Sequence, residues 1–292
     1  MKNKKILFTI IIIIILLFIY LIYINKTQEN FVASRNIMVS QLIGGLGNRI
    51  YMIMAGLSFA EKWNMDYYFL ESEIIPDKHS NNNTIINELK ILFPDIKFLN
   101  KSTDTTLWKR LNENNVSDKI DNSNNIILSG FFQNEDKYFN NYKMNFPEPS
   151  NNIFKNIDTS RLFFIHFRFG DYIGTSFELN LIDYYKSCIN KIKNIIKDPL
   201  FFVITNDIEM TTNYIKTNNL LNENEHFIDK SNSNRLDTLY YVSKCKGGIC
   251  SNSSFSRIGA YFIQDRDKRL IFYPIKKEDN INISWLTTYI IN

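Results

Sequence analysis

The chain has 292 residues, of which 45% are hydrophobic and 22% are charged, a composition that excludes an intrinsically disordered protein. The net charge is +4, and four lysines against one glutamate place +3 of it in residues 1–30, which leaves about +1 on the rest. Nucleic acid is therefore not an expected partner. The length suits one large domain or two lobes of ordinary size.

Residues 6–24 form an uncharged and almost wholly apolar run that is long enough to cross a bilayer as one helix. Three lysines precede it, so the positive-inside tendency predicts a type II membrane protein. An ER- or Golgi-type membrane with a lumenal catalytic domain is the expected location. Residues 1–5 would form the cytoplasmic tail and residues 25–35 a lumenal stem. A cleaved signal peptide is the alternative, but the run is long and no small-x-small cleavage site follows it.

Beyond the stem, strand-like and helix-like segments alternate, which predicts an α/β fold with parallel sheets. The first unit is a strand at 36–43, a helix at 49–63 and a strand at 66–70. The other predicted strands are 125–131, 162–167, 200–205, 225–228, 247–250 and 269–273. The other predicted helices are 182–196, 235–244 and 255–264.

Two features mark the connections between these elements. Asn-rich stretches such as residues 80–84 are typical of turn-prone loops. Pro147 and Pro149 mark the best candidate boundary between two lobes. The sequence thus predicts an N-terminal lobe at 36–150 and a C-terminal lobe at 151–292, both Rossmann-like and facing each other across a cleft.

A glycine-rich turn, Gly44-Gly45-Leu46-Gly47-Asn48, stands between the first predicted strand and its helix. Glycines at such a position let backbone N–H groups approach a ligand at a helix N-terminus, so Gly45, Gly47 and Asn48 are candidate binding residues. The spacing matches neither G-x-x-x-x-G-K-[ST] nor G-x-G-x-x-G. A plain tight turn without a ligand explains this segment equally well.

The predicted strand at 162–167 runs into polar residues: the sequence is His166-Phe167-Arg168-Phe169-Gly170-Asp171-Tyr172. Open α/β sheets bind ligands at this carboxyl edge. Arg168 suits a diphosphate leaving group, because its planar and permanently charged guanidinium forms bidentate hydrogen bonds. The alternative is a surface salt bridge between Arg168 and Asp171, beside a histidine satisfied in the core.

A serine-rich segment, Ser251-Asn252-Ser253-Ser254-Phe255-Ser256, follows the predicted strand at 247–250 and opens a helix. The hydroxyls of Ser253 and Ser254 and the backbone N–H of Phe255 make a candidate anion site at the helix N-terminus. Ordinary N-capping by one of the two serines is at least as good an explanation.

Two other patterns carry less chemistry. Asp265-Arg266-Asp267 is formally a D-x-D metal motif, but it follows a predicted helix near the C-terminus and is expected to be a charged turn. Cys188, Cys245 and Cys250 are too few for a disulfide framework and form no C-x-x-C. Isolated buried thiols are expected, with a Cys245–Cys250 bond as the alternative in an oxidising compartment.

Taken in order, the three motifs resemble the signatures of glycosyltransferase family 11, the α-1,2-fucosyltransferases. Residues 44–48 resemble the family's G-G-L-G-N-Q, residues 166–172 its H-[VI]-R-R-G-D-Y and residues 251–261 its S-N-S-T-F-S-W-W-G-A-W. Shorter resemblances occur at 130–133, 184–185 and 205–209. The sequence departs from the family pattern at Arg49, Phe169, Asn206, Arg257 and Ile258.

The resemblance implies a two-lobed GT-B fold, GDP-β-L-fucose as the donor, inversion at the anomeric carbon, no cofactor and no required metal. It also implies a glycan acceptor, with a galactose-terminated one expected. The resemblance implies that Arg168 binds the β-phosphate, helped by Ser253, Ser254 and the backbone N–H of Phe255. It implies that Asp237 recognises the guanine and that Asn48 contacts the sugar. Asp171 would bind the ribose or orient Arg168. The general base is left open, although His166 is chemically able to serve.

Two competing hypotheses remain beside an active fucosyltransferase. One is a GT-B transferase that uses another nucleotide sugar. The other is a membrane-tethered glycan-binding protein with a degenerate catalytic site, which the departures from the family signatures motivate.

Overall fold

The computed structural model describes residues 35–77, 80–116, 124–228, 234–264, 269–276 and 283–291. The predicted tail, the membrane anchor and all but the last residue of the stem lie outside these ranges, as do residues 265–267 of the D-x-D pattern. Within the described part of the chain, no helix combines the length and apolar character that a membrane span requires.

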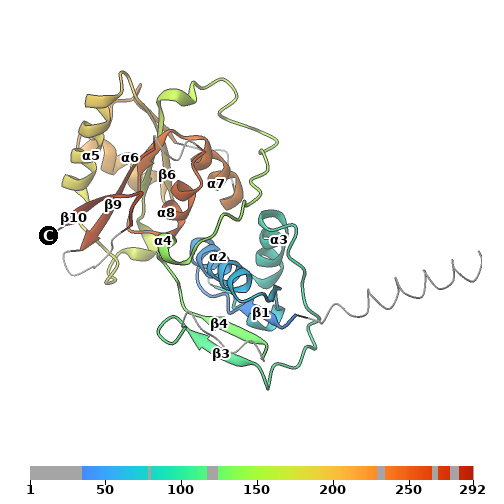
Figure 1. The fold of residues 1–292 in the computed structure, drawn as a ribbon. Helices are drawn as coiled ribbons and strands as arrows, with labels where there is room; N and C mark the ends of the chain where they lie inside the picture. Colours follow the sequence, from blue (N-terminus) through green and yellow to red (C-terminus); the bar gives the residue numbers. More distant parts are fainter. Residues whose placement is uncertain are drawn as a thin grey trace, which may run out of the picture.

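The described residues form two lobes, each built on its own sheet (Figure 1). The smaller lobe contains β1 (Ile37–Ser40), α2 (Leu46–Lys62), β2 (Asp66–Tyr67), α3 (Asn82–Leu92), β3 (Lys109–Asn112) and β4 (Ile126–Ser129). Its four strands are all parallel, in the order β2-β1-β4-β3. A short helix, α4 (Glu135–Tyr138), follows β4 on the way to the second lobe.

The larger lobe contains β5 (Leu162–Phe167), α5 (Ile182–Ile195), β6 (Leu200–Thr205), α6 (Ile208–Thr217), β7 (His226–Ile228), α7 (Arg235–Lys244), β8 (Gly247–Ile249), α8 (Ser254–Tyr261), β9 (Leu270–Lys276) and β10 (Thr287–Ile291). Its six strands are also all parallel, in the order β10-β9-β8-β5-β6-β7. The predicted α/β fold with parallel sheets is therefore confirmed. The connection between β4 and β5 contains the predicted lobe boundary at residue 150, and that boundary stays a prediction.

Strand β5 lies inside the larger sheet and is buried along its whole length. Alternate side chains of a strand point to opposite faces, and Phe163 and Ile165 pack in the cluster that α5 and α6 help to form. Leu162 and Phe164 pack in the cluster that contains residues of α7 and α8. The larger sheet is therefore covered by helices on both faces, as a parallel sheet requires.

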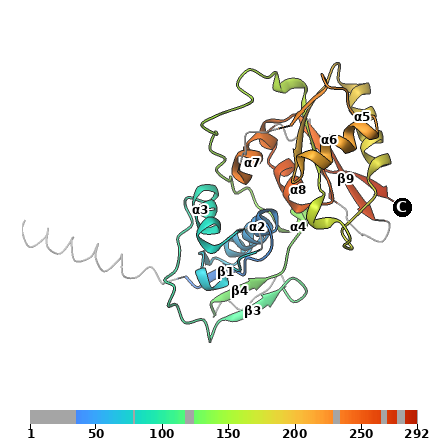
Figure 2. The ribbon, with the colours of Figure 1, turned by 180° about the vertical axis from the view of Figure 1, so that it is seen from behind.

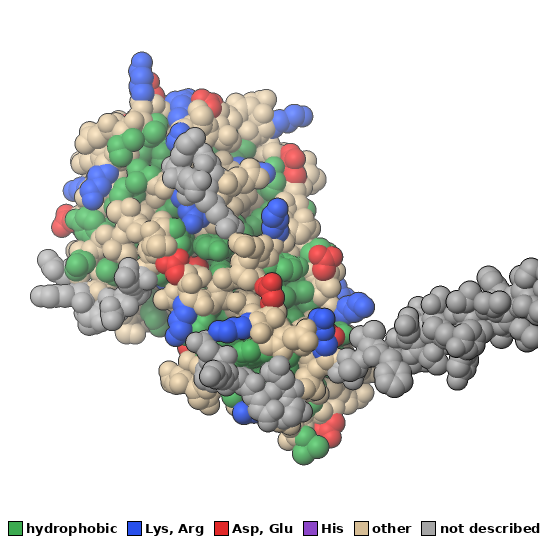
Figure 3. All heavy atoms as spheres, in the orientation of Figure 1, with side chains coloured by type: hydrophobic (Ala, Val, Ile, Leu, Met, Phe, Trp, Pro, Cys, Tyr) green, Lys and Arg blue, Asp and Glu red, His purple; other side chains and the backbone are tan. Residues whose placement is uncertain are grey.

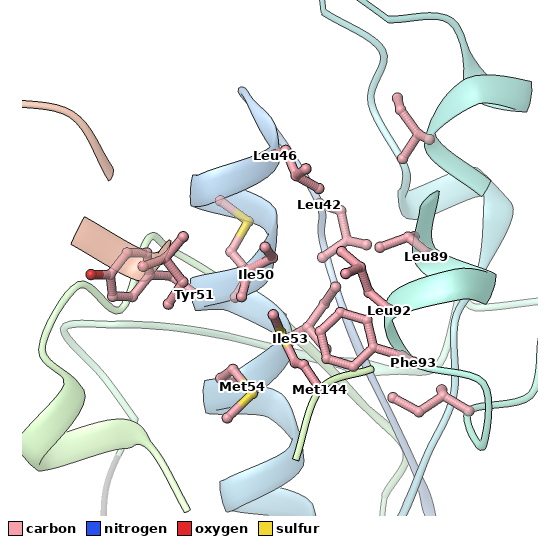
Figure 4. Close-up of a cluster of buried hydrophobic side chains, with 14 of the residues drawn as sticks. Leu42, Leu46, Ile50, Tyr51, Ile53, Met54, Leu89, Leu92, Phe93 and Met144 are labelled. Atoms are coloured by element: carbon pink, nitrogen blue, oxygen red, sulfur yellow. The ribbon is translucent and has the colours of Figure 1, made fainter. Parts of the chain in front are cut away.

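The core of the smaller lobe continues into the larger one. Helix α2 packs its apolar side chains against α3, and Figure 4 shows Leu46, Ile50 and Ile53 of α2 on the side of Leu89 and Leu92 of α3. The same cluster contains side chains from α7 and α8 of the larger lobe, namely Leu236, Leu239 and Ile258. The lobes consequently share packed apolar surface on one side of their junction.

The described surface carries charges of both signs. Figure 3 shows lysine and arginine side chains interspersed with aspartate, glutamate and apolar side chains over the visible face of both lobes. This distribution agrees with the near-neutral charge expected for the part of the chain after residue 30.

The three cysteines are free and buried, so the predicted isolated thiols are confirmed and a Cys245–Cys250 disulfide is not formed.

Candidate functional site

Arg168 is the first residue after β5, at the carboxyl edge of the larger sheet. Its Nη2 forms an ion pair with Asp171 Oδ2 at 2.8 Å, and the guanidinium lies 5.1 Å from the centre of the Tyr172 ring. Both charged side chains are half-buried. Of the two roles considered for Asp171, this geometry favours the orientation of Arg168.

Asn206, which follows β6, holds the turn that carries these residues. Its Oδ1 accepts a hydrogen bond from Phe169 N at 2.9 Å, and its Nδ2 donates to Phe169 O at 3.0 Å and to Asp171 Oδ1 at 3.3 Å. Gly170 has a φ of +59°, a left-handed conformation that glycine adopts without strain. Sequence reasoning noted Asn206 only as a departure from the family pattern, whereas the structure makes it a positioning residue.

The segment before α8 lies beside this turn. The Tyr172 hydroxyl, whose pKa burial raises, lies near the side chain of Ser253, which lowers that pKa, and Asn252 Nδ2 donates to Phe177 O at 2.8 Å. Because Tyr172 also lies against Arg168, the structure brings Arg168 and Ser253 to one place at the carboxyl edge. Two of the sequence motifs therefore meet as the sequence predicts.

The N-terminus of α8 is already engaged. Ser253 is its N-cap and accepts a hydrogen bond from Phe255 N at 3.3 Å, while Ser254 is half-buried in the first turn. A Cβ atom added to Gly47 would lie 2.6 Å from Phe255 N and 2.7 Å from Phe255 Cα, so α2 packs directly on this turn. Gly47 thus permits close helix packing and Phe255 N–H serves the cap, and the expectation that they approach a ligand stays a prediction.

Substituting Gly47 tests this packing. Alanine in a helix is ordinarily favoured over glycine by about 1 kcal/mol, but here the methyl group would meet backbone atoms of Phe255 and Ser254. We expect Gly47→Ala to lower the free energy of unfolding by about 1–3 kcal/mol, as overpacked sites do, measured by urea denaturation. In Gly45→Ala, the matched control, the added Cβ has no atom within 4 Å. A Gly47→Ala protein as stable as the wild type would contradict the proposed packing.

The first turn of α2 holds the other candidates of the glycine-rich motif. Gly44 has a φ of +74° and Gly45 is the exposed N-cap of α2, without a side-chain cap. Asn48 is half-buried, and its Oδ1 accepts a hydrogen bond from Gln133 Nε2 at 2.9 Å. Asp237 lies further away in sequence, half-buried in the first turn of α7.

His166 faces the α8 side of the sheet and is buried. Its Nδ1 lies 2.9 Å from Ser251 Oγ, and its carbonyl accepts a hydrogen bond from the Tyr185 hydroxyl at 2.7 Å. Burial, and after it the charge of Arg168, lowers the pKa of the imidazole to about 3. Burial and the contact with Ser251 suit a structural role for His166, and its candidacy as the general base stays a prediction.

A buried ion pair that the sequence did not predict joins the two lobes. Arg257 Nε and Nη2 donate to Glu135 Oε1 and Oε2 at 2.9 Å and 2.6 Å, and Arg257 Nη2 also donates to Gln133 O at 2.7 Å. The Tyr51 hydroxyl of α2 bonds to the same carboxylate. Arg257 stands at the first Trp position of the family pattern, so the departure supplies a link between α8 and α4.

A second arginine–carboxylate pair lies at the same junction. Arg235, at the start of α7, forms an ion pair with Glu88 of α3 at 2.7 Å and donates to Ser80 Oγ at 2.7 Å. Arg49, another departure from the family pattern, is buried in the smaller lobe and bonds to Asp77 Oδ2 and Ile75 O, both at 3.1 Å.

The described residues contain no group of three or more His, Cys, Asp and Glu that could hold a metal ion.

The sequence profile of Glycosyl transferase family 11 matches residues 108–286. The fold and the site define a parallel α/β protein with polar residues at the carboxyl edge of its larger sheet. The chain belongs to glycosyl transferase family 11. A search of curated proteins found no match.

Solved structures to which the chain is similar include two fucosyltransferases. NodZ from Bradyrhizobium has a TM-score of 0.46 and 11% sequence identity, over 78% of this chain and 93% of NodZ. FUT1 from Arabidopsis thaliana, solved with GDP, has a TM-score of 0.44 and 11% identity, over 88% of this chain and 75% of FUT1. Likenesses this distant carry no weight in the assignment of function.

Proposed function

We propose that the protein is an inverting fucosyltransferase that moves L-fucose from GDP-β-L-fucose to a hydroxyl group of a glycan, forming an α-1,2 link to galactose. The observation that carries the proposal is the placement of Arg168, paired with Asp171 and next to Ser253 at the carboxyl edge of the sheet. Membership of glycosyl transferase family 11 supports the reaction class.

The chemistry of the transfer needs positive charge where the diphosphate departs. As the acceptor hydroxyl attacks the anomeric carbon, the bond from that carbon to the β-phosphate oxygen breaks and negative charge develops on the phosphate. A guanidinium held in place before the reaction stabilises this charge without reorganisation. Asp171 and Asn206 hold Arg168 and its turn in that way.

The remaining groups complete the proposed donor site. Ser253 and Ser254 supply hydroxyls near Arg168, Asp237 binds the guanine through its carboxylate, and Asn48 contacts the sugar. The acceptor hydroxyl loses its proton late, to solvent or to the departing GDP, because the transition state resembles a sugar cation and the attacking oxygen needs little help from a base. No metal or cofactor takes part, and the N-terminal anchor holds the enzyme to a lumenal membrane face.

A transfer assay tests the proposal. The full chain in detergent would be incubated with GDP-fucose and a galactose-terminated oligosaccharide, and the product would be analysed by mass spectrometry and linkage NMR. We expect a fucosylated product, GDP release that rises when acceptor is added, and activity that persists in EDTA. Turnover of another nucleotide sugar in preference to GDP-fucose would contradict the proposed donor.

A second candidate function is glycan binding without turnover. The departures from the family signatures favour it, because Arg257 stands at an aromatic position of the family pattern and is engaged by Glu135. Glycan binding together with no hydrolysis or transfer from any nucleotide sugar would establish this alternative.

A further inference from the structure

The loop after β5 carries exposed apolar side chains beside the charged site. In both ribbon views, the chain after β5 reaches the end of the larger lobe that faces the smaller one (Figure 1, Figure 2). Phe177 is 60% exposed and Ile173 is 47% exposed. Binding sites for small molecules are lined by apolar and aromatic side chains with a few polar groups, and this loop places such side chains beside Arg168.

Hydrogen bonds hold this loop in place. Thr175 Oγ1 donates to Tyr172 O at 2.7 Å, and Gly174 N donates to the Glu178 carboxylate at 2.6 Å. The Asn252 amide, from the segment before α8, donates to Phe177 O at 2.8 Å. The backbone of Phe177 is thus tied to the segment that caps α8, and the exposed ring stands on a supported turn.

Tyr172 connects the ring of Phe177 to the proposed diphosphate site. The Phe177 and Tyr172 ring centres are 5.5 Å apart, tilted by 33°, and the Arg168 guanidinium lies 5.1 Å from the Tyr172 ring centre. The Arg168 guanidinium and the Phe177 ring centre are therefore no more than about 11 Å apart. At that separation, the Phe177 ring is within reach of a sugar that is leaving a phosphate bound by Arg168. The loop therefore borders the place where an acceptor has to enter.

We propose that Phe177 binds the acceptor glycan, with its ring packed against the apolar C–H face of a hexose and with Ile173 extending the same surface. This inference rests on the proposed function and names the acceptor-binding surface of that site. A pyranose ring presents such an apolar face while its hydroxyls remain free for transfer, and an exposed aromatic ring offers a rigid apolar surface. The donor is bound through charge and hydrogen bonds at Arg168, so the two substrates use different residues.

The test compares Phe177→Ala with Phe177→Trp, and with Ile195→Ala as a matched control. Ile195 is 66% exposed and ends α5. Since α5 runs back from the carboxyl edge to the amino end of β6, Ile195 lies at the opposite edge of the same sheet. Each full-length variant would be applied to an array of galactose-terminated and N-acetylglucosamine-terminated oligosaccharides, and GDP affinity would be measured by calorimetry.

For Phe177→Ala we expect glycan binding to weaken on the order of 3- to 10-fold, the range of one aromatic contact, with an unchanged GDP dissociation constant. Phe177→Trp and Ile195→Ala should bind as the wild type does. Equal glycan binding by Phe177→Ala and wild type, or no glycan binding by the wild type, would overturn the inference. Because this readout needs no turnover, a wild type that binds glycans through Phe177 but never uses GDP-fucose would refute the proposed donor and leave the surface established.

Discussion

Arg168→Ala is expected to lower the rate of transfer from GDP-fucose on the order of 100- to 1,000-fold, the effect of removing one preorganised charge-stabilising group from a transition state. The loss should appear in kcat, because the β-phosphate gains charge as the sugar departs. Hydrolysis of GDP-fucose in the absence of acceptor should fall by a similar factor. GDP release in a coupled assay measures both rates.

Two further variants show whether the loss comes from the geometry of the guanidinium. Arg168→Lys keeps the charge but loses the planar fork, so it should recover only part of the activity. Arg161 precedes the same strand at its other end, where it donates to Asp198 O at 2.7 Å. Arg161→Ala should leave turnover unchanged, and an Arg168→Ala enzyme that keeps more than a tenth of wild-type activity would rule out the assigned role.

Glu135→Ala should have the largest effect on stability. Arg257 is 2% exposed and the Glu135 side chain is fully buried, so the substitution leaves a buried guanidinium without its counter-charge. Breaking such a pair costs about 3–5 kcal/mol. Because Glu135 belongs to α4 and Arg257 to α8, we expect the free energy of unfolding in urea to fall by that amount for a transition that involves both lobes.

A double substitution separates the cost of an uncompensated charge from lost packing. In Glu135→Leu with Arg257→Met, both charges are replaced by apolar side chains, and such replacements are often neutral or stabilising. The double variant should therefore be more stable than Glu135→Ala. If Glu135→Ala cost less than about 1 kcal/mol, the range of exposed pairs, the ion pair would not be buried between the lobes as described.

The central strands and one helix were predictable because each is a short run with an unambiguous local pattern. Predicted strands 162–167 and 200–205 and predicted helix 235–244 coincide with β5, β6 and α7. Helix α3 was missed because its first turn lies in the Asn-rich stretch that predicted a loop. In the structure Asn81 is its N-cap and accepts a hydrogen bond from Thr84 N.

In the candidate site, too, features set by neighbouring residues were predictable, and contacts between residues far apart in the sequence were not. Arg168 at a strand end and Ser253 at a helix start are local features, and both lie where the motifs placed them. The close approach of Gly47 to Phe255 and the pairing of Arg257 with Glu135 depend on how two lobes dock. A single sequence carries no signal for such partners, since each joins positions more than 100 residues apart.

Binding of nucleotide sugars by the full chain tests the central claim most directly. Calorimetric titration would compare GDP-fucose with UDP- and CMP-sugars, each with wild type and Arg168→Ala. We predict that GDP-fucose binds at least about tenfold more tightly than the others, a difference of about 1.4 kcal/mol, and that binding of GDP-fucose weakens when the guanidinium is removed. Equal or tighter binding of a UDP- or CMP-sugar, or no dependence on residue 168, would contradict the account.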